Sequence, residues 1–400
     1  MREFLTFSGP ETQKRMLRTV YNQGASTRQE LADRMECSLL TASKTVTALL
    51  EEGVMITDGT MSSTGGRRKD ILKINPEYRV CLCADIGYGS IKLALVALNG
   101  DVIKKETISS GVNPIRDGIP YDRMIVQMER MLEAVDRERM LGIAVGISGM
   151  VSFEEGKVLF CPNIHGFDNR SLAEELEARF DLPVLLDTSA RCMAAGEYRF
   201  GAGRGLNEQI CLSLGRGSIA AGILMDGRLY RGKDGYAGEI GHTCIRPGER
   251  VVKCSCGGYD CLELYATLQM LCGNVRHELY GEEIAAGRIP AEKELTAENL
   301  KELVEAGHPV ATGCLEKAID DIATVLVGVV NLFAPEAVIV GGGFSECFPG
   351  ILEALEKKVC SACLTPLRER IRLLPSVLKG ESALRGAAAM MIGRYFGEEL

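Results

Sequence analysis

Hydrophobic and polar positions follow different periods along the chain, and the period changes near residue 80. Before it, apolar residues recur every three to four positions, which predicts three short helices near 11–23, 28–35 and 40–52. After it, apolar runs predict buried strands at 80–86, 90–98, 141–148, 182–186, 209–214, 219–224 and 337–340. Helical patterns lie between them at 121–139, 171–180, 262–278, 297–306 and 311–332. Strands and helices mix throughout, which predicts an α/β architecture.

The later part of the chain repeats one unit. A strand, a glycine turn, a second strand and a tight turn follow one another at 80–100 and again at 209–227. The last predicted strand runs into Gly341-Gly342-Gly343, where the backbone can approach a ligand closely. The repetition predicts two similar lobes.

The first three helices have the spacing of a helix-turn-helix. One set of apolar residues is expected to face inward: Leu31, Ala32, Met35, Val46, Leu49 and Leu50. The opposite face of the third helix carries short hydroxyl side chains and one cation, able to reach base edges and phosphates: Thr41, Ser43, Lys44 and Thr47. We therefore expect these four residues to bind DNA.

A predicted hairpin follows the third helix, with strands near 54–56 and 71–74. Its tip carries Arg67, Arg68 and Lys69 behind two glycines, which suits contact with phosphates or the minor groove. Such a hairpin is a wing. The alternatives are that the three cations form only a solvated charge run and that the helices belong to a structural bundle.

Composition indicates a protein of two or three domains. The chain has 400 residues, of which 46% are hydrophobic and 25% charged. Residues 1–79 hold 12 Lys and Arg against 10 Asp and Glu, whereas the remainder holds 34 against 44. The first segment therefore has a small positive net charge and the remainder a negative one. The 15 cysteines of the whole chain lack framework spacing, and neither a signal peptide nor an uninterrupted apolar stretch of about 18 residues is found. We expect a reducing, cytoplasmic location and no membrane contact.

Three thiols and one imidazole lie close together in the sequence. Cys254, Cys256 and Cys261 can supply thiolates and His242 a ring nitrogen, which completes a tetrahedral Zn²⁺ shell with no open position. Gly257 and Gly258 allow the tight turn that a chelating loop needs. The prediction is a structural zinc ion. The alternatives are packed free thiols and disulfides.

Several separated motifs, in order, resemble the ROK family of repressors, open reading frames and sugar kinases. They are the winged helix ending in Ser63-Thr-Gly-Gly-Arg-Arg, the Asp85-Ile-Gly turn, Gly196-Glu197, the 237–242 run Ala-Gly-Glu-Ile-Gly-His and the Cys-x-Cys-Gly-x-x-x-Cys-Leu-Glu run at 254–263. The resemblance implies a two-lobed, actin-like (ribonuclease H-like) sugar kinase fold behind a winged helix of the repressor branch. We assign residues 1–79 to the DNA-binding domain, 80–190 to the first lobe and 191–400 to the second lobe with the zinc motif.

The resemblance also implies which residues hold sugar hydroxyls: Gly149, Asn163, Glu239, His242 and Glu263. Carboxylates and an amide suit polyols, and zinc on one nitrogen of His242 would direct the other toward the ligand. Each residue also has a simpler interpretation. Asn163 could cap a turn, Glu239 could be an exposed loop charge, and Glu263 could only start a helix.

Departures from the family pattern argue against kinase activity. Where the family's kinases carry the aspartate that acts as general base, this chain has Ser189, which is too weak a base near neutral pH. The two phosphate turns become Gly87-Tyr88-Gly89-Ser90 and Gly215-Arg216-Gly217, so ATP is not expected to bind. Asp260 replaces the usual glycine before the third cysteine, which leaves the local turn geometry open.

These features predict a sugar-responsive repressor of carbohydrate genes. Paired winged helices in a homodimer, or a dimer of dimers, would grip operator DNA, and a sugar or sugar phosphate would release it. One alternative is an ATP-dependent sugar kinase with an appended DNA-binding domain, in which Arg216 binds phosphate and Asp187 serves as the base. A third alternative is a zinc sensor, but the complete set of four ligands argues against it.

Overall fold

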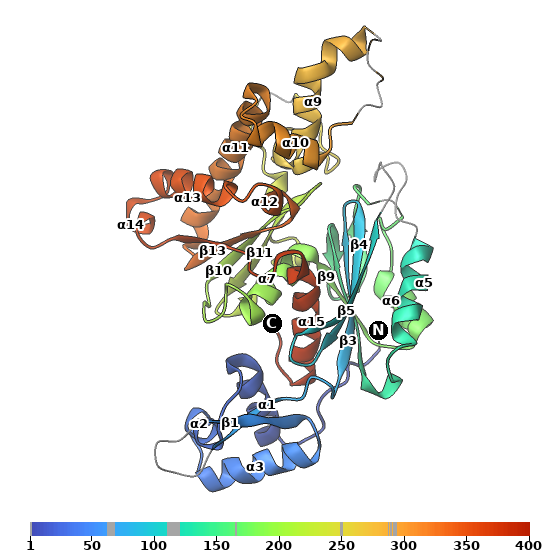
Figure 1. Cartoon of the computed structure of the whole chain (residues 1–400), viewed down its shortest axis with the longest axis vertical. Coiled ribbons are helices and arrows are strands. Elements are labelled where there is room, and N and C mark those ends of the chain that lie inside the picture. The colour runs from blue at the N-terminus through green and yellow to red at the C-terminus, as the bar shows by residue number, and fades with distance from the viewer. Residues whose placement is uncertain are drawn as a thin grey trace.

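The computed structural model of the chain describes residues 2–61, 69–109, 121–164, 166–248, 251–286, 288, 290 and 294–400. Figure 1 shows a small N-terminal part at one end and two larger parts, each built on a sheet. A helical region caps the far end of the second sheet.

The N-terminal part is a helix-turn-helix followed by a hairpin. Thr27 and Glu30 form a capping box that starts the second helix, and the hydroxyl of Ser38 accepts the N–H of Thr41 to start the third. The elements are α1 (Glu11–Gln23), α2 (Arg28–Arg34), α3 (Leu39–Glu51), β1 (Met55–Met61) and β2 (Lys69–Ile74). The three helices lie within one residue of their predicted ends. The residues predicted to face inward are buried or, for Leu50, partly buried against the same core.

Two five-stranded sheets share one topology. Their strand orders are β5-β4-β3-β6-β9 and β12-β11-β10-β13-β14. In each sheet the first three strands are antiparallel and the last two join in parallel. The strands of the first sheet are β3 (Val80–Gly87), β4 (Ser90–Ala97), β5 (Val102–Ser109), β6 (Met140–Ile147) and β9 (Val184–Thr188). Those of the second are β10 (Gln209–Leu214), β11 (Ile219–Met225), β12 (Arg228–Leu229), β13 (Ala337–Gly341) and β14 (Arg372–Pro375). The predicted α/β class is confirmed, with the unit repeated.

The other elements cover these sheets or lie beyond the far end of the second one. In the first half they are α5 (Tyr121–Leu132), the hairpin β7 (Met150–Ser152) and β8 (Lys157–Phe160), and α6 (Leu172–Phe180). In the second half they are α8 (Glu263–Ala266), α9 (Leu268–Ala285), α10 (Ala297–Glu305), α11 (Pro309–Phe333), α12 (Gly343–Cys347), α13 (Ile351–Ala362) and α14 (Thr365–Arg368). The single helix predicted over 262–278 was wrong, because the chain leaves the helix at Thr267, whose side chain caps α9.

Two helices that the sequence pattern did not predict lie between the sheets. Helix α7 (Ser189–Phe200) packs on β10 and β11, whereas α15 (Ser382–Tyr395) packs on β3 and β6 (Figure 1). The two helices meet backbone to backbone, since a Cβ atom on Gly386 would lie 1.6 Å from the carbonyl oxygen of Cys192. The buried carboxylate of Glu197 on α7 accepts the hydroxyl of Ser382 on α15 at 2.9 Å. The α7–α15 pair therefore joins the two sheets into one body.

The last residues of the chain return to the N-terminal part. The Tyr21 ring of α1 packs edge-on against Phe200 of α7 and against Phe396, just after α15. The N–H of Phe7 donates to the carbonyl of Tyr395 at 2.8 Å. These contacts place the winged helix against the ends of α7 and α15. The proposed boundary at 190/191 falls inside α7, and the division into three domains stays a prediction.

Among the described residues, no helix combines the length and the apolar character needed to cross a bilayer.

Candidate functional site

One pocket lies between the two sheets, at the point where α7 begins. Its lining comes from both halves of the molecule: Ile147, Ser148, Gly149, Met150, Phe160, Pro162, Asn163, Thr188, Ser189, Ala190, Ser213, Ser218, Ile219, Ala220, Glu239, His242 and Glu263. All five residues predicted to hold a sugar are in this set. They come from two segments, 149–163 and 239–263, which are 76 residues apart in the sequence and which the fold brings together.

Two carboxylates give the pocket its chemistry. Burial raises the pKa of Glu239, and the Arg191 guanidinium opposes that rise. The pKa of Glu263 is raised to about 7, chiefly by burial and in part by the nearby Glu239 carboxylate. The interpretation of Glu239 as an exposed loop charge is wrong, because its side chain is half-buried in the pocket wall. Each carboxylate can accept hydrogen bonds from two hydroxyls, as a polyol would require.

The amide of Asn163 joins the two halves. Its Nδ2 donates to the carbonyl oxygen of Gly217 at 3.3 Å, across the interface between the sheets. Gly149, also in the pocket lining, has no room for a side chain, since a Cβ there would lie 2.8 Å from the carbonyl oxygen of Phe160. A ligand that contacts Asn163 and also Glu239 or Glu263 would therefore bridge the two halves.

Ser189 stands at the floor of the pocket with its hydroxyl already engaged. Its Oγ donates to the Oδ1 of Asp85, at the end of β3, at 2.7 Å. A serine hydroxyl is itself a very weak base, and here it donates its proton to a carboxylate. Ser189 can orient a ligand, and it cannot take a proton from one near neutral pH.

Asp187, the alternative base, faces away from the pocket. Its carboxylate is fully buried and bonded to the guanidinium of Arg191 and to the Nε of Arg231, the latter at 3.1 Å. A buried carboxylate held by two cations is fixed in place. Movement of Asp187 into the pocket would leave two guanidinium groups without their partner.

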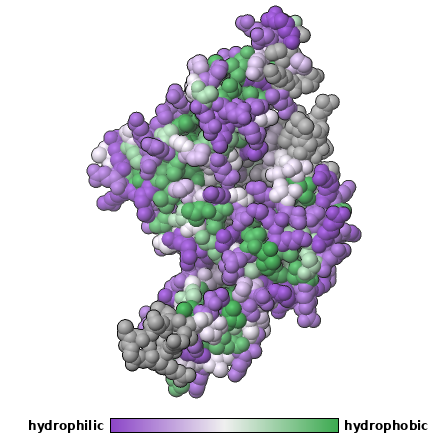
Figure 2. All heavy atoms as spheres, in the orientation of Figure 1, coloured by the Kyte–Doolittle hydropathy of each residue, from purple (hydrophilic) through white to green (hydrophobic). Residues whose placement is uncertain are grey.

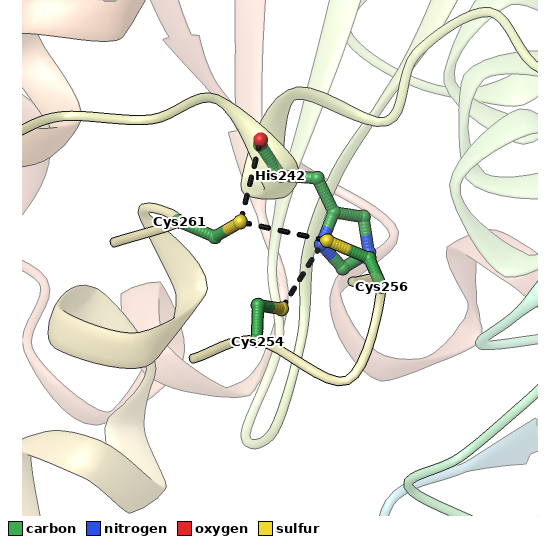
Figure 3. A group of neighbouring side chains, drawn as sticks. All are labelled: His242, Cys254, Cys256 and Cys261. Carbon is green, nitrogen blue, oxygen red and sulfur yellow. Dashed lines mark hydrogen bonds between the residues drawn. The ribbon is translucent and has the colours of Figure 1, made fainter. Parts of the chain in front are cut away.

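The four predicted metal ligands form one cluster, which Figure 3 shows as converging side chains. Their ligand atoms all lie within 4.8 Å of one another. The Sγ atoms of Cys256 and Cys261 are 3.7 Å apart, and the Sγ of Cys254 is 3.6 Å from the Nδ1 of His242. Two thiolates on tetrahedral zinc lie about 3.8 Å apart, given bonds of about 2.3 Å. The residues present therefore fit a tetrahedral zinc ion.

The turn before the third cysteine is formed by Asp260 in the place of a glycine. Its φ of 54° lies in the left-handed region, which glycine adopts without strain. The Asp260 carboxylate compensates by accepting the N–H groups of Val251 and Val252 at 3.0 and 2.9 Å and the hydroxyl of Tyr265 at 2.6 Å. The departure from the family pattern thus leaves the loop ordered, with Glu263 in the pocket wall.

The metal cluster and the pocket share a wall. The Nδ1 of His242 faces Cys254, which leaves Nε2 as the ring nitrogen available to a ligand. Glu263 follows Cys261 by two residues, and its Oε1 lies 3.5 Å from the Nδ1 of His242. A bound zinc ion would fix this ring and this carboxylate together.

The two turns that the family resemblance assigns to nucleotide phosphates carry large side chains here. The ring of Tyr88 from the first half reaches the second half, where a Cβ on Gly217 would lie 2.7 Å from its Cγ. Arg216 lies over the glycine run, and a Cβ on Gly343 would lie 3.2 Å from its Cγ. These side chains stand beside the glycine positions at which a nucleotide would meet the backbone.

The predicted DNA-contacting residues lie on one side of α3. Thr41, Lys44 and Thr47 are exposed, whereas Ser43 is half-buried and its carbonyl accepts a bond from Arg28. Lys69 begins β2, and Arg67 and Arg68 lie outside the described residues. The sequence interpretation did not include Leu39 and Leu40, which are exposed in the first turn of the same helix.

A comparison of the sequence with protein families matches the ROK family over residues 81–394. The chain belongs to the ROK family. The xylose repressor of Caldicellulosiruptor bescii is 28% identical over 382 residues, which cover 94% of each chain. A glucokinase of the family from Streptomyces griseus, solved with glucose and AMPPNP, is 29% identical with a TM-score of 0.66, and the match covers 77% of this chain and 98% of that one.

A solved ROK transcriptional regulator, described as a homologue of the E. coli MLC protein, matches the fold over almost the whole molecule. It covers 97% of each chain with a TM-score of 0.75 and 24% identity. The glucokinase match leaves out about as much of the chain as the winged helix occupies. The ROK fold predicted from the motifs is confirmed, including the helix-turn-helix in front of it.

We predict that the purified protein carries one zinc ion per chain. Replacing Cys254 by serine removes a thiolate from a four-ligand shell, so it should abolish stoichiometric zinc and lower the melting temperature. Cys244→Ser is the matched control, because this exposed cysteine lies beside Cys261 but is not part of the cluster. Elemental analysis of both variants tests the assignment. Zinc-free wild-type protein, or equal loss from the Cys244 variant, would contradict it.

Proposed function

We propose that this protein is a sugar-responsive transcriptional repressor. One observation carries the proposal: a helix-turn-helix with an exposed polar face is joined, in one body, to a carboxylate-lined pocket in which Ser189 takes the place of the kinase base. The relative named a xylose repressor supports this combination of sugar response and repression.

The winged helix would bind operator DNA. Thr41, Ser43, Lys44 and Thr47 would enter the major groove, and the cations Arg67, Arg68 and Lys69 would contact backbone phosphates or the minor groove. A homodimer, alone or paired into a tetramer, would match a palindromic operator with two such units. A repressor of this kind acts in the cytoplasm, where its operator DNA lies.

The effector would be a sugar or sugar phosphate in the pocket between the sheets. Glu239 and Glu263 would accept hydroxyl hydrogen bonds, and the Nε2–H of a zinc-bound His242 would donate one. Asn163 and the backbone at Gly149 would complete the contacts. Zinc, when bound, would supply rigidity to this wall, since its four protein ligands leave no position for substrate.

Three features argue that the pocket senses sugar without phosphorylating it. Ser189 replaces the base and is bonded to Asp85, while Asp187 is buried between two arginines. General-base catalysis contributes about a hundred- to ten-thousand-fold in rate, so its loss alone removes useful turnover. The positions of Tyr88 and Arg216 over the phosphate turns argue in the same direction.

A continuous helix would carry the signal from the pocket to the winged helix. Helix α7 begins at Ser189 in the pocket floor and ends at Phe200, which packs against Tyr21 of α1. Its 12 residues span about 18 Å, at 1.5 Å per residue. Helix α7 packs backbone to backbone on α15. A shift of one half of the molecule relative to the other would therefore move the C-terminal end of α7 as part of a rigid unit.

The last turn of α7 holds the winged helix through a polar cluster. Arg199 bonds the side-chain oxygen of Asn22 on α1 and lies 2.7 Å from the carboxylate of Glu398. Glu398 in turn accepts the Nδ2 of Asn22 at 3.3 Å. The guanidinium of Arg199 is almost fully buried, so this cluster, which we call the Arg199 clamp, depends strongly on its geometry.

We predict that the protein binds DNA from upstream of its own gene in a salt-dependent manner and that one sugar weakens this binding. Coupling between two sites typically changes affinity about 5- to 150-fold, so a shift of this size is expected. Fluorescence anisotropy at fixed salt, with a panel of sugars and sugar phosphates, measures it. Glu239→Gln should bind DNA normally and lose the response.

Two results would contradict the proposal. The first is an absence of salt-dependent DNA binding, or DNA binding that every sugar leaves unchanged. The second is ADP release with a hexose or N-acetylhexosamine well above the buffer rate, which would favour the kinase alternative. In that case Asp187→Asn should abolish turnover.

We also predict that the Arg199 clamp transmits the response. Glu398→Gln keeps the hydrogen-bonding shape but removes the charge opposite Arg199, so sugar and DNA should each bind nearly normally while the sugar-induced shift shrinks. A loss of roughly 1 kcal/mol of coupling corresponds to about fivefold in that shift. Glu399→Gln removes the same charge one residue further on and should behave as wild type. An unchanged shift in Glu398→Gln would exclude this route.

A further inference from the structure

Two leucines stand exposed at the start of the recognition helix. Leu39 and Leu40 are 48% and 66% exposed, whereas the apolar residues on the inner side of α3, Ala42, Val46 and Leu49, are fully buried. The side chain of Leu40 therefore takes no part in the core of the winged helix. A leucine on a small DNA-binding unit leaves apolar surface in water unless a partner covers it.

Leu40 shares a stripe with the polar residues of the DNA-facing side. Positions three and four residues apart lie together on a helix, so Leu40, Lys44 and Thr47 form one line along α3, and all three are exposed. Thr41 lies beside this line, and its N–H is held by the Ser38 cap. Figure 2 shows hydrophobic surface at the lower tip of the molecule, where α3 begins. The leucine thus occupies the leading end of a surface that is otherwise polar and cationic.

The position of Leu40 determines what it would meet on DNA. In a helix-turn-helix the N-terminal residues of the second helix contact base edges in the major groove. A leucine side chain has no hydrogen-bonding group, and the apolar feature that the major groove presents is the C5-methyl group of thymine. Lys44, one turn further along α3, would meet phosphate or a base acceptor.

We propose that Leu40 reads a thymine in each operator half-site through its C5-methyl group. The proposal rests on the proposed function, and it adds a specificity-determining residue that is neither a donor nor an acceptor. Burial of one methyl against leucine is worth about fourfold in affinity, and two symmetry-related contacts about fifteenfold. Leu39 lies about 100° around the helix from Leu40 and is left outside this contact.

The test compares two forms of the upstream DNA that differ only in thymine methyl groups. One fragment is amplified with thymidine triphosphate and the other with deoxyuridine triphosphate, which keeps base pairing and removes every methyl. Wild-type protein should bind the thymine fragment about four- to fifteenfold more tightly. Leu40→Ala should lower affinity for the thymine fragment and bring the ratio close to one. Single deoxyuridine substitutions then locate the thymine that is read.

Two control variants separate this contact from general effects. Lys44→Ala should weaken binding to both fragments equally and keep the wild-type ratio. Leu332→Ala, which truncates a leucine that is 76% exposed at the end of α11, should also keep it. Circular dichroism checks that Leu40→Ala is folded, as expected for an exposed side chain.

The outcomes distinguish the two proposals. Salt-dependent binding with equal affinity for both fragments, or a ratio that Leu40→Ala leaves unchanged, overturns the thymine contact and leaves the repressor proposal standing. No salt-dependent binding to either fragment overturns both. A thymine preference that disappears only in Leu40→Ala supports the contact.

Discussion

The close crossing of α7 and α15 is the constraint on which the rest of the molecule depends. The glycines at 196 and 386 allow two backbones to meet where any side chain would force them apart, since a Cβ on Gly196 would lie 2.3 Å from the carbonyl oxygen of Ser382. The buried carboxylate of Glu197 ties the same point to both serines at 376 and 382. One sheet packs on each helix, so the crossing sets the distance between the pocket walls and the place of the winged helix.

The pocket illustrates how a kinase fold can serve a sensor. Its carboxylates, amide and imidazole remain where a polyol would need them, and the group that would take the sugar proton is a serine bonded to Asp85. The neighbouring aspartate at 187 neutralises Arg191, whose guanidinium also donates to the carbonyl of Gly235. Under the proposed function, these side chains would bind the sugar by accepting and donating hydrogen bonds, and Ser189 would not take its proton.

Much of this arrangement could be predicted from the sequence, because its signals are local. The apolar spacing before residue 80 located α1, α2 and α3 to within one residue, and the ligand spacing from 242 to 261 predicted the metal cluster. The two central helices could not be predicted. Helix α15 is buried on almost every side, so it has no polar face and no helical period, and α7 is buried along most of its length. The break at Thr267 and the fixed position of Asp187 likewise depend on tertiary contacts.

The central claim is that the pocket and the winged helix are coupled. Coupling between two binding sites is reciprocal, so a sugar that releases operator DNA must itself bind more weakly to the DNA complex, and by the same factor. The most direct measurement is therefore calorimetric titration of the releasing sugar into the protein alone and into its operator complex at one salt concentration. The account predicts weaker sugar binding to the complex, by the factor seen in DNA release. Equal sugar affinity in both states would contradict it.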